Sequence, residues 1–146
     1  MKKWLAVLTV LVLVSALLPN AVLAGNPMVY IYGRVIDTNA RPVESVRLRI
    51  LREVKPTCLV CRNWVVLSHS VTADRGYFGF GVSPIPGTYL IQFFTSGYYI
   101  VDIRCPQGVL SQRSSDGSSI EFRLLSEMAR DGVKLGEFVF VVNSLQ

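Results

Sequence analysis

Three cysteines and one histidine are the residues of this chain whose types could do chemistry. Cys58 and Cys61 are separated by two residues, His69 follows them, and Cys105 lies further along. We expect at least one disulfide, most simply between Cys105 and one of Cys58 or Cys61, with a Cys58–Cys61 bond as the alternative. Three thiolates and one imidazole also form a zinc ligand set, which is a second alternative.

The Cys58–Cys61 spacing also occurs in redox-active and haem-binding motifs, but the neighbouring residues argue against both. A redox-active first cysteine lies at the start of a helix, whose dipole lowers the thiol pKa. Here Arg62-Asn63-Trp64 leads into a strand pattern instead. Haem attachment needs a histidine directly after the second cysteine, and this chain has Arg62 there. We therefore expect a structural disulfide.

The other polar residues do not form a catalytic pattern. His69 lies in a strand pattern without a Gly-x-Ser-x-Gly nucleophile motif nearby. The acidic residues are dispersed, and glycine-rich phosphate loops are absent from the sequence. We therefore expect no catalytic residue and no cofactor, no metal ion apart from the zinc alternative, and a chain that is not an enzyme.

Alternating apolar and polar residues predict a series of short strands. Val46, Leu48 and Ile50 alternate with Arg47 and Arg49, which is the period of a half-buried strand. Turn residues separate such segments every 8 to 12 residues, which is typical of an all-β sandwich. The predicted strands span residues 29–37, 46–51, 64–72, 77–82, 88–95, 98–104, 120–125 and 137–142, and residues 126–133 could hold a helical turn.

The amino-terminal residues have the pattern of a secretory signal peptide. Two lysines precede an apolar run, residues 4–18, which Pro19 ends, and Val22 and Ala24 suit a cleavage site before Gly25. The run is about 15 residues long, shorter than the roughly 20 that span a bilayer. We expect a cleaved signal peptide, a secreted, periplasmic or cell-surface protein, and no stable membrane span after cleavage.

The predicted organisation is a signal peptide at residues 1–24 and one domain at residues 25–146. A domain of this length can bury a sizeable apolar core. The formal net charge of the whole chain is +5, and its basic residues are scattered rather than clustered. Nucleic-acid binding usually needs a block of Lys and Arg, so we expect no nucleic-acid partner.

Five motifs follow one another in a fixed order between residues 29 and 104: GRVID (33–37), RPVESVRL (41–48), TADRGYFGF (72–80), PGTYL (86–90) and GY (97–98). In this order they resemble the carboxypeptidase regulatory-like domain family. That resemblance implies an antiparallel, immunoglobulin- or transthyretin-like β-sandwich of seven or eight strands, of a kind found in many exported proteins. The family's sandwich has no catalytic residues of its own, so none is carried over.

A ligand face is predicted where aromatic and basic residues share strand parity. Tyr30, Tyr32 and Arg34 share one face of a predicted strand, and Arg47 and Arg49 share one face of the next. If these strands lie side by side, the five side chains form a strip that could stack on sugars or meet an acidic partner.

Two functions remain open from the sequence. The first is an exported, non-catalytic module that binds a cell-envelope polymer, a carbohydrate or another exported protein. The second is a structural subunit, and hence a homo-oligomer, that assembles through strand edges with residues 137–142 as the exchangeable strand. We expect residues 137–142 to pair within the sandwich and close an edge, because both faces of this strand are apolar.

Overall fold

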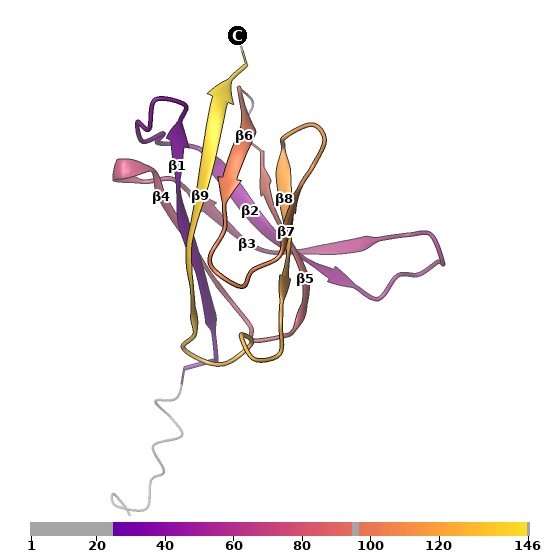
Figure 1. Cartoon of the computed structure of the whole chain (residues 1–146). Coiled ribbons are helices and arrows are strands. Elements are labelled where there is room, and N and C mark those ends of the chain that lie inside the picture. The colour runs from indigo at the N-terminus through magenta and orange to yellow at the C-terminus, as the bar shows by residue number, and fades with distance from the viewer. Residues whose placement is uncertain (1–24, 95–96, 146) are drawn as a thin grey trace, which may run out of the picture.

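The computed structural model describes residues 25–94 and 97–145, so the signal peptide expected at residues 1–24 lies outside the described part. The described chain forms two sheets that pack face to face as a sandwich (Figure 1). The strand orders are β4-β1-β9-β6 and β3-β2-β5-β8-β7. The strands are β1 (Val29–Asp37), β2 (Arg47–Val54), β3 (Asn63–Val71), β4 (Tyr77–Val82), β5 (Gly87–Phe93), β6 (Tyr98–Arg104), β7 (Ser111–Arg113), β8 (Ser119–Leu124) and β9 (Lys134–Ser144). The all-β sandwich expected from the sequence is confirmed.

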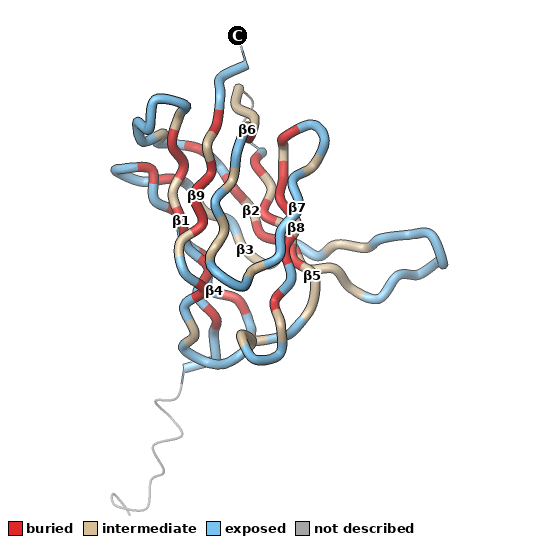
Figure 2. Tube along the Cα trace, viewed as in Figure 1, coloured by how far each residue is buried: buried red, intermediate tan, exposed pale blue. Residues whose placement is uncertain are grey.

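The alternation of side chains along each strand sets which face is buried. In β1, Val29, Ile31 and Val35 are fully buried, whereas Tyr30 and Tyr32 between them are exposed. The burial pattern of β4 alternates in the same way. The buried faces of the two sheets therefore meet, while the alternate residues form two outer faces (Figure 2).

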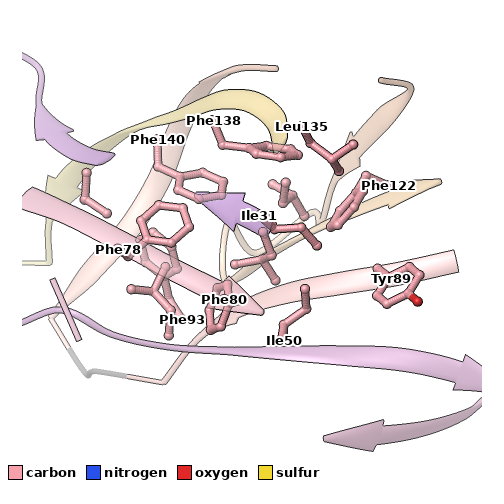
Figure 3. Close-up of a cluster of buried hydrophobic side chains, with 14 of the residues drawn as sticks. Ile31, Ile50, Phe78, Phe80, Tyr89, Phe93, Phe122, Leu135, Phe138 and Phe140 are labelled. Carbon is pink, nitrogen blue, oxygen red and sulfur yellow. The ribbon is translucent and has the colours of Figure 1, made fainter. Parts of the chain in front are cut away.

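Aromatic rings from both sheets interdigitate in the core (Figure 3). From the four-stranded sheet, Phe140 stacks on Phe78 at 5.5 Å between ring centroids. Phe140 also meets the edge of Phe93, from the five-stranded sheet, at 5.3 Å. Phe138 contacts Phe122 across the sandwich at 5.2 Å. This ladder of rings joins β4 and β9 to β5 and β8 and fixes the separation of the sheets.

The sheets are not antiparallel throughout, which corrects the sequence-based expectation. β9 runs parallel to β1, with Gly33 opposite Phe138 and Val35 opposite Phe140. The connection from β8 crosses from one sheet to the other and returns the chain to the end of the sandwich at which β1 begins. There Gly132 N donates a hydrogen bond to the backbone oxygen of Met28, at 2.8 Å. β9 therefore starts beside the start of β1 and runs in the same direction.

β9 pairs within the sandwich as expected, but it does not close an edge. It lies between β1 and β6, with hydrogen-bonded neighbours on both sides. Phe138, Phe140 and Val142 are fully buried on its inner face, and Val139 is only 7% exposed on the outer face. A strand apolar on both faces suits this central position. The described part also has one strand more than the expected maximum of eight, because β7 was not predicted.

Both open sides of the sandwich are linked by side-chain hydrogen bonds. On one side, Gly79 N of β4 donates to Ser70 Oγ of β3 at 3.3 Å. On the other side, Arg113 of β7 donates from Nη1 to the backbone oxygen of Ile100 in β6, at 2.9 Å. The β2–β3 hairpin is the part that projects clear of the body (Figure 1).

Candidate functional site

The outer face of the four-stranded sheet carries a cluster of tyrosines. Tyr30 and Tyr32 of β1 are 44% and 36% exposed, and Tyr77 of β4 is 45% exposed. β1 and β4 pair in a register that places Tyr77 opposite Arg34, so these side chains share one face. Tyr30 and Tyr32 are alternate residues of β1, about 6.6 Å apart, and Tyr77 lies on the neighbouring strand, diagonally across from Tyr32 at about 7–8 Å. We call Tyr30, Tyr32 and Tyr77 the tyrosine platform.

Two glycines of β4 lie on the same face of the sheet, beside the tyrosine platform. Gly81 lies opposite Tyr30, and Gly79 lies opposite Tyr32. A Cβ added at Gly79 would meet no described atom within 4 Å beyond its chain neighbours, whereas one at Gly81 would meet Met28 Sδ at 2.9 Å. The backbone at Gly79 is therefore open between Tyr32 and Tyr77. Such a surface can receive a flat ligand against aromatic faces.

Arg34 adds a charged side chain beside the tyrosine platform. Its Nε lies 3.3 Å from Glu137 Oε1 of β9. Both side chains are partly exposed, 42% for Arg34 and 35% for Glu137. Arg34 lies opposite Tyr77 and Glu137 lies opposite Tyr32, so the pair adds polar groups beside two residues of the platform. Of the sequence-predicted ligand face, Tyr30, Tyr32 and Arg34 therefore do lie together.

Arg47 and Arg49 do not join them, which corrects the expectation of one continuous strip. Their strand, β2, belongs to the five-stranded sheet, whereas β1 belongs to the other sheet. The connection between β1 and β2 crosses the sandwich, so neighbouring strands in the sequence are not neighbours in space. On the opposite outer face, Arg49 Nε donates to Gln92 Oε1 at 2.7 Å, and its guanidinium lies over Phe94.

The disulfide is Cys58–Cys61, with the two Cα atoms 5.2 Å apart, and Cys105 is a free thiol. This corrects the pairing that we considered simplest and selects the alternative. Cys58 and Cys61 lie in the tip of the hairpin that projects from the sandwich (Figure 1), whereas Cys105 directly follows β6. Cys105 Sγ lies 2.8 Å from Ser111 Oγ. Burial raises the pKa of Cys105, and the hydrogen bond with Ser111 opposes this only in part.

The zinc alternative is not met within residues 25–94 and 97–145, which hold no cluster of three or more His, Cys, Asp or Glu residues able to bind a metal ion. Cys58 and Cys61 are bonded to each other. His69 lies edge-on to Phe94, with 5.7 Å between the ring centroids.

An arginine that sequence reasoning missed binds two carboxylates at the base of the hairpin. Arg62 contacts Glu53 through Nε at 2.7 Å and Glu121 of β8 through Nη1 at 2.9 Å. Its guanidinium also lies 4.9 Å from the centroid of the Trp64 ring. The hydrogen bonds to Glu53 and then Glu121 raise the pKa of Arg62, and the bond from Arg62 lowers the pKa of Glu53. We call Arg62, Glu53, Glu121 and Trp64 the arginine clamp.

Arg62 and Glu121 of the arginine clamp line one side of a polar pocket of about 390 Å³ on the outer face of the five-stranded sheet. The turn before β8 forms the opposite wall, where Asp116 accepts hydrogen bonds from Ser114 Oγ and from Ser118 N and Oγ. These bonds lower the pKa of Asp116 to about 2 and keep the turn closed. The pocket is lined by Arg62, Leu90, Gln112, Arg113, Ser114, Ser115, Ser119 and Glu121.

Across the described segments there is no helix long and apolar enough to cross a membrane.

Comparisons with known proteins include a weak structural likeness. No family model and no curated protein matches the chain. A crystal structure of (S)-allantoin synthase matches with a TM-score of 0.42 and 17% sequence identity, over 83% of this chain and 45% of that one. The expectation that the chain is not an enzyme is contradicted by this comparison, because the solved protein is an enzyme, and we withdraw that expectation. A likeness at this level carries no argument for any activity of this chain.

Proposed function

We propose that this chain is an exported β-sandwich module that binds a cell-envelope polymer or other carbohydrate through the tyrosine platform. The observation that carries the proposal is the exposure of Tyr30, Tyr32 and Tyr77 on one face, beside the open backbone of Gly79. The faces of sugar rings present C–H groups, which pack on aromatic faces while the ring hydroxyls bond to polar neighbours. Arg34 and Glu137 supply such neighbours.

The repeat of the platform suits a polymer better than a single small molecule. Two tyrosines of β1, about 6.6 Å apart, and a third on β4, about 7–8 Å from Tyr32, can each contact a unit of an extended chain. The surface is open rather than enclosed, so a long ligand can lie across it. Several weak stacking contacts on one polymer together give a useful affinity.

Export of the chain is part of the proposal and has its own support. Disulfides form and persist mainly in oxidising compartments outside the cytosol, and Cys58–Cys61 is such a bond. We infer that the signal peptide is removed before Gly25. The intact mass of the exported protein tests this, since retention of residues 1–24 would contradict it.

We also propose that the domain is a divergent relative of the carboxypeptidase regulatory-like domains. The motif at residues 72–80 contains the turn Asp74–Gly76 and the start of β4, and Gly76 has the positive φ of 74° that its tight turn needs. The motif at residues 86–90 leads into β5. An experimental structure with a different turn before β4 would count against this assignment.

Binding to insoluble polymers tests the proposed function. The mature chain, residues 25–146, is mixed with chitin, cellulose or peptidoglycan, and the bound fraction is measured against protein concentration. We expect saturable binding to at least one polymer, weakened at least tenfold by Tyr32→Ala and by Tyr77→Ala. Phe94→Ala is the matched control, because Phe94 is 43% exposed on the opposite sheet and should leave binding unchanged. Equal binding by all four proteins, or binding to no polymer, would refute the platform.

A further inference from the structure

One edge of the five-stranded sheet is open along half of a strand. β3 pairs with β2 on one side, and none of the strands in the described part pairs with its other side. Near its end, Ser70 accepts a hydrogen bond from Gly79 of β4, which covers that part of the edge. The first part, residues 63–66, lies in the projecting hairpin (Figure 1), so its outer edge is exposed to solvent, whereas Leu67 packs against the core. Val65 and Val66 there are 45% and 40% exposed.

This edge has one of the features that keep edge strands from pairing, a one-residue bulge at Leu67, but it lacks the others. Proteins protect such edges with charged residues, prolines or very short strands. β3 has nine residues, NWVVLSHSV, without a Lys, Arg, Asp, Glu or Pro. By comparison, β7 at the other edge of the same sheet has three residues and includes Arg113. β6, at the edge of the other sheet, carries Asp102 and Arg104.

The hairpin that carries the open edge is held in shape before any partner arrives. The Cys58–Cys61 bond closes its tip, where Leu59 and Val60 are almost fully exposed. The arginine clamp fixes its base to β8 through Glu121. A preformed edge loses little conformational entropy when it binds, so pairing is more favourable than for a flexible strand.

We propose that two copies of this chain pair antiparallel through residues 64–66 of β3, before the bulge, about a two-fold axis at Val65. The pairing joins two five-stranded sheets into one sheet of ten strands. Each Val65 lies opposite Val65 of the second copy, and Trp64 lies opposite Val66.

The sequence of the edge fits a second copy because it is self-complementary. Residues 64–66 are Trp, Val and Val, so in a two-fold pairing Val65 meets Val65 on one face and Trp64 meets Val66 on the other. No like charges are brought opposite each other, because β3 carries none. A two-fold interface uses the same patch on both copies. The hairpins project from the sandwiches, so the two bodies stay apart while the edges meet.

Because a two-fold axis places Val65 opposite Val65, charged substitutions at this position test the proposed dimer directly. Light scattering and sedimentation of residues 25–146 should show a monomer–dimer equilibrium. Val65→Lys and Val65→Glu place like charges opposite each other, and each should weaken the dimer at least tenfold. An equimolar mixture of the two variants should restore a dimer. Leu110→Lys is the control, because Leu110 is 71% exposed outside β3 and should leave the equilibrium unchanged.

Cross-linking tests the register separately. In a Cys105→Ser background, Val65→Cys should form a disulfide-linked dimer on mild oxidation, whereas Leu110→Cys should not. A protein that stays monomeric at millimolar concentration would overturn the proposal. A dimer that neither lysine nor glutamate at position 65 weakens would overturn it as well. Neither outcome bears on polymer binding, which is measured on the opposite sheet.

Discussion

Tyr32 lies opposite Gly79 across the β1–β4 pair, and the backbone at Gly79 is left open. In β4, Gly79 follows Phe78 and precedes Phe80, both of which point into the core. The alternation of phenylalanine and glycine thus fills the inner face and clears the outer one. A strand that served packing alone would gain from a larger residue at position 79, because glycine is unfavourable in strands.

Gly79→Ala should separate fold from function. The added methyl meets open space, so the free energy of unfolding should stay unchanged or rise by up to about 1 kcal/mol, since alanine restricts the unfolded chain more than glycine. Polymer binding should fall, because the methyl group would occupy the open space over position 79, beside Tyr32. Thermal melting and the binding assay on the same protein sample check both parts. Full binding by a stable Gly79→Ala protein would show that this open space is not used.

Gly33→Ala should have the opposite effect on stability. Gly33 lies on the inner face of β1, where a Cβ would overlap the backbone oxygen of Phe138 and lie 2.8 Å from the ring of Phe78. Backbone atoms of a central strand cannot move aside without disturbing the sheet. We expect a loss of about 1–3 kcal/mol or more, measured by urea unfolding. A melting temperature equal to that of the parent protein would contradict this.

The sequence was informative where period-two patterning governs the structure. β1, β4 and β6 have the predicted bounds, and in β1 and β4 the apolar side chains that reach the core alternate with outward residues, whereas a bulge at Val101 interrupts this alternation in β6. It was less informative where a strand is defined by its neighbours. β7, with the sequence SQR, has no apolar pattern and exists because β8 offers it a pairing edge.

The ligand face illustrates the same limit. The shared parity of Tyr30 and Tyr32 is local and could be predicted, and so could that of Arg47 and Arg49. Whether β1 and β2 are neighbours depends on which sheet each strand joins, and no local pattern contains that information. Tyr77 belongs to the platform only through the β1–β4 register. The arginine clamp likewise joins residues 53, 62 and 121, which no short motif connects.

Removing the arginine clamp should loosen the hairpin without unfolding the sandwich. Trp64 is the one tryptophan in residues 25–146, so its fluorescence reports the clamp directly. Arg62→Lys loses the paired contacts that a planar guanidinium makes, so the emission should shift to longer wavelength. Global stability should fall by less than about 1 kcal/mol, because the ion pairs are partly exposed. Arg123→Lys, on the exposed side of β8, is the control and should leave the emission unchanged.

The arginine clamp should also open in acid. The pKa of Glu53 is lowered in the folded protein, so its contribution is fully present above the pKa of an unfolded glutamate, about 4.3. It is lost as the pH falls further and Glu53 takes up a proton. The Trp64 emission should therefore change below about pH 4.3 in the parent protein. In Arg62→Lys the emission should already be shifted at pH 7, and an acid transition of full size there would argue against the clamp.

Cysteine chemistry should follow the structure rather than the simplest expectation from the sequence. Non-reducing peptide mapping should find Cys58 linked to Cys61 and one free thiol, at Cys105. That thiol should react slowly with iodoacetamide, because its raised pKa leaves little thiolate at neutral pH. Reducing the short Cys58–Cys61 loop should destabilise by about 2 kcal/mol at most in the chain-entropy model. Finding a peptide that links Cys105 to either of the others would overturn this arrangement.

Phe138→Ala should be among the most destabilising single changes in this chain. The Phe138 ring is fully buried and contacts Phe122 across the sandwich, and β9 holds β1 and β6 together. Truncation to alanine leaves a cavity in the core, and such changes cost about 3–5 kcal/mol. Val141→Ala, on the partly exposed outer face of the same strand, is the matched control and should cost much less. Urea unfolding of both variants measures the difference, and similar losses for the two would mean that β9 contributes through its backbone pairing rather than through the aromatic ladder.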